Sequence, residues 1–208
     1  MKKALLLVIA ILLVAGAAYG AGTIVGSKHD IRGYVTGETT TQVCVFCHVP
    51  HNAATSWGGP LWNHANTAST FGLYTSATLQ GATSQPSGVS RACLSCHDGT
   101  VAVNSLINAP KDGTVGTLIS MTGTALLGTD LTNDHPVSIT YRQDLDSGLR
   151  ANTGATVPGP AFTAQLYGTA SPYTVECASC HAVHDPTNTP FLRIANTNSQ
   201  LCTTCHLK

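Results

Sequence analysis

The chain of 208 residues has eight cysteines, and all eight belong to one repeated pattern. The cysteines form four pairs. Within each pair two residues separate the cysteines, and a histidine follows the second cysteine directly, in the form C-x-x-C-H. We call the four copies the first to fourth attachment segments: residues 44–48, 93–97, 177–181 and 202–206. This pattern constrains the fold more than any other feature, because two thiols and one imidazole must share a short turn at four places.

The C-x-x-C-H pattern is typical of covalent haem attachment. In a helical turn, two sulfurs reach one edge of the macrocycle and form thioethers, and the histidine provides the first axial ligand of the iron. The predicted thioether residues are Cys44, Cys47, Cys93, Cys96, Cys177, Cys180, Cys202 and Cys205. The predicted proximal ligands are His48, His97, His181 and His206. We therefore expect four c-type haems.

Two other kinds of site use paired cysteines. Paired C-x-x-C units also build zinc sites, but zinc does not require histidine at the same place in every unit. An exported chain can use eight cysteines as a disulfide scaffold, but that reading leaves the four histidines unexplained.

Five further histidines are available for the opposite faces of the irons. After removal of a leader only Met121 remains as a methionine, so histidine is the predicted second ligand throughout. The predicted distal ligands are His29, His51, His135 and His184. His64, in "PLWNHAN", is the spare and is expected to pack or hydrogen-bond near a haem.

His51 and His184 each follow a proximal histidine by three residues. Residues three apart in a helical turn lie on the same side, so neither can bind the opposite face of its own haem. We expect His51 to ligate the second haem and His184 the fourth, which defines two two-haem units, residues 44–97 and 177–206. The stretch 98–176 joins them.

The N-terminus resembles a leader. Two lysines precede the apolar run Ala4–Ala18, and small residues follow, which predicts a signal peptide over 1–20 and a tetrahaem cytochrome domain over 21–208. A membrane anchor is the alternative, but the run is short of the roughly 20 apolar residues that a spanning helix needs. The protein is thus expected to be exported, with no membrane span in its mature form.

Charge argues against nucleic acid as a partner. Without Lys2 and Lys3, eight basic residues face ten acidic ones, and no basic patch is evident. The chain is rich in glycine, threonine, serine, asparagine and proline, and poor in aromatic residues. We therefore expect mostly irregular coil, short helical turns at the attachment segments, little strand apart from 135–141, and the haem stack as the core.

The motifs "SKHDI", "CVFCHVPHNA", "PLWNHAN", "CLSCHDGTVAV", "NDHPVS" and "CASCHAVHDP" together resemble the doubled C-x-x-C-H multihaem c-type cytochromes of bacteria. Within that group the chain looks like the tetrahaem cytochromes that form extracellular electron-conducting filaments, or cytochrome nanowires. The resemblance implies bis-histidine haems in a continuous stack and a role in extracellular electron transfer.

These features predict an electron conduit and not an enzyme, because ligands for four irons leave no open coordination position. The expected partners are redox proteins or extracellular acceptors, and further copies of the chain. A short N-terminal arm carrying His29 could ligate a haem of its own chain or of the next subunit, and the second arrangement builds a homopolymer. The alternative is a discrete periplasmic carrier, and a multihaem reductase is a third possibility.

Overall fold

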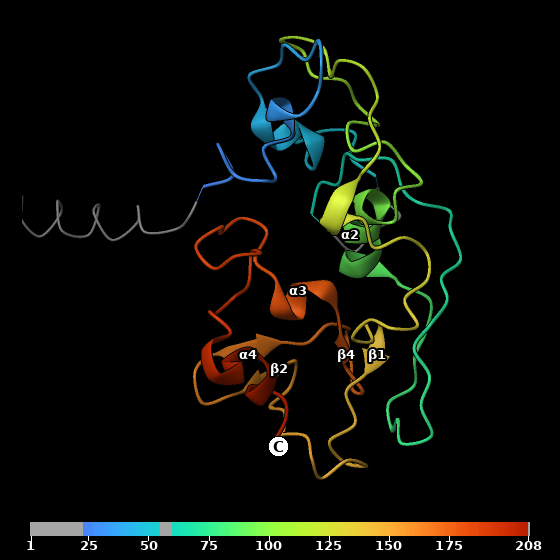
Figure 1. The fold of residues 1–208 in the computed structure, drawn as a ribbon, viewed down its shortest axis with the longest axis vertical. Helices are drawn as coiled ribbons and strands as arrows, with labels where there is room; N and C mark the ends of the chain where they lie inside the picture. Colours follow the sequence, from blue (N-terminus) through green and yellow to red (C-terminus); the bar gives the residue numbers. More distant parts are fainter. Residues whose placement is uncertain (1–22, 55–59, 208) are drawn as a thin grey trace, which may run out of the picture.

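The computed structural model describes residues 23–54 and 60–207, so the predicted signal peptide lies outside the described residues. Within them turns, bends and irregular coil predominate, as expected from the composition (Figure 1). The helical elements are η1 (Ile31–Gly33), η2 (Val43–Phe46), α2 (Gly88–His97), η3 (Gly123–Ala125), α3 (Cys177–Cys180), η4 (Thr197–Ser199) and α4 (Gln200–Thr203). The strands are β1 (Ile139–Thr140), β2 (Thr156–Pro158), β3 (Thr163–Gln165) and β4 (Thr174–Val175).

Each attachment segment lies on a helical turn, which confirms the prediction. The first is on η2, the second closes α2, the third occupies α3 and the fourth is on α4. Most of these turns end before the attachment histidine. The backbone of His181, for example, is already extended after α3, at φ −106° and ψ 143°. The turns are therefore just long enough to present two sulfurs and one imidazole.

The expected strand over 135–141 forms only at Ile139–Thr140. Pro136 has no backbone N–H to donate, and Ser138 has φ 51°, which breaks the extended conformation. β1 pairs antiparallel with β4, with Ile139 opposite Val175. Because β4 leads directly into α3, this small sheet fixes where the third attachment segment begins.

A second antiparallel pair, β2 and β3, has Val157 opposite Ala164, and the predicted loop around residue 160 connects the two strands. It contributes to one of two small apolar clusters, which contains Tyr141, Val157, Ala164 and Leu166. The other cluster contains Phe71, Leu94 and Leu131. Among the described residues, clusters of this size bury little apolar surface. The free energy gained by that burial is small compared with the conformational entropy lost when a chain of this length folds.

Buried asparagines replace part of the missing secondary structure. Asn104 is fully buried, and its amide donates to the carbonyls of Val115 and Thr117 at 2.8 and 2.9 Å while accepting from the Ile119 amide at 3.0 Å. One side chain thus satisfies three backbone groups that no helix or sheet would pair.

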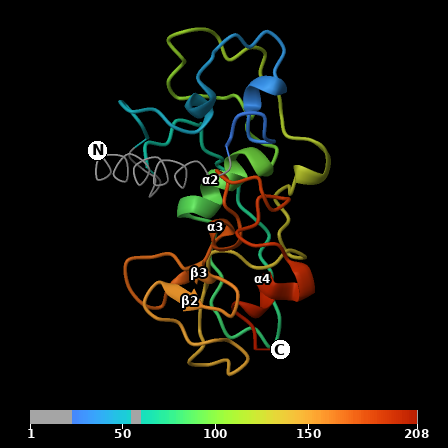
Figure 2. The same cartoon turned by 90° about the vertical axis from the view of Figure 1, so that its left-hand side faces the viewer.

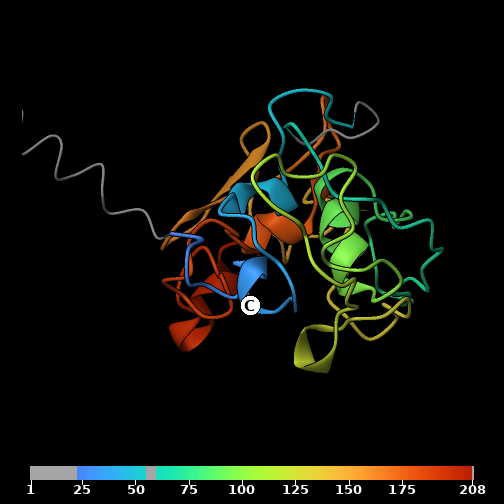
Figure 3. The same cartoon turned by 90° about the horizontal axis from the view of Figure 1, so that it is seen from above.

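The four attachment segments follow one another along the longest axis of the molecule. Figure 1 shows the turn of η2 near the top, α2 and α3 at mid-height and α4 near the bottom, and Figure 2 shows the same order from the side. Viewed along that axis, α2 stands close to α3, with coil around them (Figure 3), and these two helices are in contact. No helix among the described residues is long and apolar enough to cross a membrane.

Candidate haem-binding site

A short backbone segment pairs with the histidine of three attachment segments. We call these the clamps: residues 60–63, 190–193 and 147–150. In each, one residue forms an antiparallel bridge to the attachment histidine: Trp62 to His48, Leu192 to His181, and Leu149 to His206. The same arrangement therefore recurs at the first, third and fourth segments.

The last residue of each clamp donates two hydrogen bonds to the adjoining C-x-x-C turn. Its backbone N–H reaches the carbonyl of the second cysteine, and its side chain reaches the carbonyl of the residue after the first cysteine. The backbone bonds are Asn63 to Cys47 (2.9 Å), Arg193 to Cys180 (2.9 Å) and Arg150 to Cys205 (2.8 Å). The side-chain bonds are Asn63 to Val45 (2.8 Å), Arg193 to Ala178 (2.7 Å) and Arg150 to Thr203 (2.8 Å). Carbonyls at the end of a helical turn have no partner within the turn, so the clamp satisfies them and fixes its shape.

Three attachment histidines are held by hydrogen bonds of their Nδ1 atoms. Nδ1 of His48 bonds to the Pro60 carbonyl at 2.9 Å, and Nδ1 of His181 to the Pro190 carbonyl at 3.0 Å. In the second segment, which has no clamp, Nδ1 of His97 bonds to the Ala125 carbonyl at 2.7 Å. A neutral imidazole that donates from Nδ1 keeps a lone pair on Nε2, and such a bond typically orients a metal-ligating histidine.

Two clamps place a bulky residue in the left-handed region, since φ is 58° at Leu61 and 59° at Phe191. Such a conformation costs of order 1–3 kcal/mol per residue and is typical of functional sites. The clamps were missed in the sequence, although their tetrads "PLWN" and "PFLR" are a weak repeat that could have indicated them.

Three attachment histidines face a second histidine across a gap. The ring centres are 6.0 Å apart for His48 and His184, 6.2 Å for His97 and His29, and 6.4 Å for His206 and His135. A metal–imidazole bond is about 2 Å long, so two imidazoles on opposite sides of one metal ion have ring centres roughly 6 Å apart. The three gaps thus fit a bis-histidine haem iron.

The environment of His29 is suited to a metal ligand. Burial, and next the charge of His97, lowers its pKa to about 4. Its Nδ1 atom is buried without a hydrogen-bond partner. A metal ligand must be neutral, and an unpartnered buried nitrogen is costly, so coordination would suit this ring.

The distal pairing differs from the one expected. His184 lies beside His48 and not His206, and the ring beside His97 is that of His29 and not of His51. The ring contacts thus place His184 at the first attachment segment and His29 at the second, while the haem that each histidine ligates stays a prediction.

His51 is exposed, and no ring contact involves it within the described part of the chain. His181 is half-buried and, unlike the three other attachment histidines, also has no ring contact there. The assignment of His29, His51, His135 and His184 as distal ligands remains a prediction.

His64 is structural. The side chain is 1% exposed, with Nδ1 at 2.6 Å from the Ala65 carbonyl and Nε2 at 2.9 Å from the Ala102 carbonyl. Nε2 also lies 3.4 Å from the sulfur of Cys96. Both ring nitrogens are engaged, which agrees with a packing role beside the second attachment segment.

Successive cysteine pairs interact with one another. The thiol of Cys93 hydrogen-bonds to Cys177, which raises the pKa of Cys93 and lowers that of Cys177. Charge interactions also link Cys47 with Cys96, and Cys180 with Cys205. All eight cysteines are free, and burial raises the pKa of Cys47 to about 11 and of Cys96 to about 12. Such sulfurs sit in apolar surroundings that suit a thioether.

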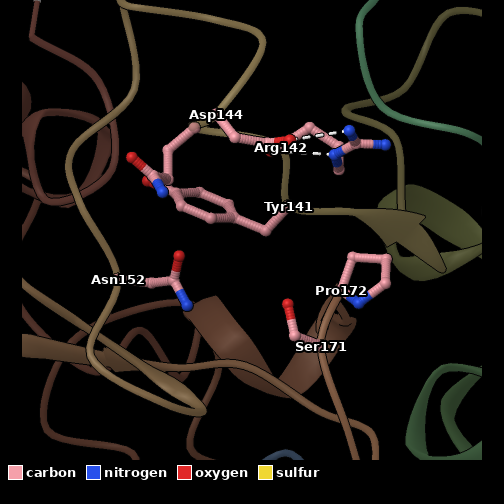
Figure 4. Close-up of a pocket in the computed structure, with 7 residues that line it drawn as sticks. Tyr141, Arg142, Asp144, Asn152, Ser171 and Pro172 are labelled. Carbon is pink, nitrogen blue, oxygen red and sulfur yellow. Dashed lines mark hydrogen bonds and ion pairs between the residues drawn. The ribbon is translucent and has the colours of Figure 1, made fainter.

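A pocket of about 430 Å³ opens near β1 (Figure 4). The two charged residues in it, Arg142 and Asp144, are paired with each other at 2.7 Å. Its lining contains neither cysteine nor histidine, so it has no place in the candidate site.

Comparison with known proteins agrees with the chemistry of the motif. A family model described as "Doubled CXXCH motif" matches residues 171–208, which hold the third and fourth attachment segments. No match was found among curated proteins. The doubled motif is that of haem-binding c-type cytochromes, which transfer electrons.

Proposed function

We propose that this chain carries four c-type haems, each ligated by two histidines, and conducts electrons along its long axis. The proposal rests on the three histidine pairs with ring centres 6.0 to 6.4 Å apart, each of which includes one C-x-x-C-H histidine. Each haem would supply one-electron chemistry, its iron passing between the ferric and ferrous states.

The protein's own residues hold the attachment turns in place and orient the histidine rings. The clamps fix three of the C-x-x-C turns, the Pro60, Ala125 and Pro190 carbonyls orient three proximal rings, and the facing histidines would provide the second ligand at three of the four haems. With both axial positions filled, no substrate could bind to the metal, which favours electron transfer over catalysis.

We assign His184 to the first haem, His29 to the second and His135 to the fourth. His51 and His181 then remain for the third. The first and third segments share the sequence C-x-x-C-H-x-x-H and the same clamp, so an exchange of distal histidines between them, His184 to the first haem and His51 to the third, is the simplest completion.

The order of the cysteine pairs supports conduction from end to end. Cys44 and Cys202 are exposed, whereas the six other cysteines are partly covered. They belong to the first and fourth segments, at opposite ends of the long axis (Figure 1). Haems held there would be reachable by a neighbour, so we favour a subunit of an extracellular filament, with a discrete periplasmic carrier as the alternative.

The decisive experiment is a haemochrome assay combined with electron paramagnetic resonance of the purified holo-protein. We expect four haems per chain, all low-spin. Fewer than four, or a high-spin signal in the native assembly, would contradict the proposal. Electron microscopy of the native material then separates the two settings, since filaments support the conduit and single particles support the carrier.

A further inference from the structure

Glu176 is a buried carboxylate at the junction of the second and third attachment segments. It directly precedes Cys177 and is 4% exposed. One oxygen accepts hydrogen bonds from the hydroxyls of Ser90 and Ser138, the latter at 2.8 Å, and the other accepts from the Thr174 hydroxyl at 2.7 Å. The backbone N–H of Ser179 also donates to this side chain.

These four bonds surround a carboxylate with donors: each partner supplies an O–H or N–H, and the carboxylate oxygens accept. All four donors are neutral, and the negative charge is therefore held by dipoles and not cancelled by a bonded cation. A charge in such a place acts over a longer range than one exposed to water.

The carboxylate lies between two haem-attachment sites. Ser90, its partner on α2, is three residues before Cys93 and also accepts the backbone N–H of Cys177 at 3.0 Å. The pKa of the Cys177 thiol is lowered mainly by the hydrogen bond from Cys93, and the charge of Glu176 acts on it in the opposite direction. The field of Glu176 thus reaches a sulfur that would carry the third haem.

Asp98 is a second buried carboxylate, on the other side of the second attachment segment. It is 4% exposed, follows His97 directly and accepts hydrogen bonds from the hydroxyl of Thr67 and from the backbone N–H and hydroxyl of Thr100. These donors are neutral too. After burial and Cys47, the charge of Asp98 helps to raise the pKa of Cys96 to about 12.

A cation lies beside both the third and the fourth segments. The guanidinium of Arg150 is anchored to the Thr203 carbonyl and lowers the pKa of Cys205, although burial raises that pKa more strongly. Arg193 is anchored to the Ala178 carbonyl in the same way, and its charge lowers the pKa of Cys180, again against a stronger effect of burial.

We propose that Glu176 and Asp98 lower the reduction potentials of the haems at the second and third attachment segments. Loss of an electron raises the positive charge of the iron, and a nearby buried anion stabilises that state; net charge around a haem or cluster is among the factors that set its potential. The inference rests on the proposed haem loading and makes these two carboxylates tuning residues for the central step of electron transfer.

The test is spectroelectrochemical titration of the full holo-protein. Glu176→Gln should shift one or two of the four midpoint potentials upwards, and Asp98→Asn should shift one upwards. Asp144→Asn is the matched control: Asp144 is exposed to water and paired with Arg142, so its charge is screened and its removal should leave all four potentials unchanged.

A structural role is separated by Ser138→Ala, which removes one hydrogen bond to Glu176 but keeps the charge. It should not raise any potential. If Glu176→Gln fails to retain four haems, Asp98→Asn provides the second, independent reading. Four low-spin haems with unshifted potentials in both carboxylate variants would overturn the inference and leave the proposed function intact, whereas a wild-type protein with fewer than four haems would refute the proposed function itself.

Discussion

The first and third attachment segments have the same contacts around the proximal histidine but differ in the residues that follow it. Both have a clamp, a left-handed residue two before the clamp's last residue, and an Nδ1 bond to a proline carbonyl. Beyond the proximal histidine they diverge. A turn closed by the Asp185 amide on the Ala182 carbonyl follows His181, whereas Pro50 and a left-handed Asn52 follow His48. The proximal side is thus built by local sequence, and the distal side depends on where the fold brings a second segment.

Removal of a haem should have the largest effect, and an unequal one. Replacing Cys177 and Cys180 with serine should lower the haemochrome count from four to three and abolish the stable native state, because the third segment packs against α2 at the centre. The same change at Cys44 and Cys47, at one end, should also remove one haem but leave a cooperative thermal transition. Equal losses of thermal stability would contradict this difference between centre and end.

Loss of a distal histidine should change spin state without removing a haem. His184→Ala should convert one of four haems to high-spin, seen by electron paramagnetic resonance, and His51→Ala should convert a different one. In a variant that lacks Cys44 and Cys47, His184→Ala should add no further high-spin haem, because its iron is already absent. His64→Ala is the control and should leave all four low-spin.

His29 tests the link between ligation and assembly. His29→Ala should make one haem high-spin, because the ring facing His97 is lost. If the arm docks on its own chain, as the 6.2 Å pair in the single chain favours, filament length by electron microscopy should not change. Loss of filaments would instead show that the contact is made between subunits.

The clamps themselves should give the smallest effects. Asn63 is fully buried and bonds through its side chain to both Val45 and Asn108, so Asn63→Ala should cost about 2–3 kcal/mol of unfolding free energy in denaturant titrations. Arg193 is exposed and makes the equivalent bond to Ala178, so Arg193→Ala should cost about 1 kcal/mol. Similar values for the two would show that burial does not distinguish the clamps.

The sequence predicts the local part of this molecule well. The spacing of the cysteines is enough to place a helical turn at each attachment segment, and the composition is enough to expect coil. The closeness of His184 to His48 could not be predicted, because these two residues are more than 130 positions apart in the chain and only the fold brings them together. Glu176 and Asp98 were missed for a related reason: nothing in the sequence shows that Ser90, Ser138 and Thr67 would bury them.

The clamps approach their turns from either direction along the chain. Residues 60–63 and 190–193 follow the segments they hold, whereas 147–150 precede theirs by more than fifty residues. The geometry around a proximal histidine thus does not depend on the order or the length of chain that connects the attachment segment and its clamp. A chain built in this way can accept insertions between motif and clamp, or a reordering of its segments, and still assemble the same four sites, so length variation among proteins of this kind should gather in those connections.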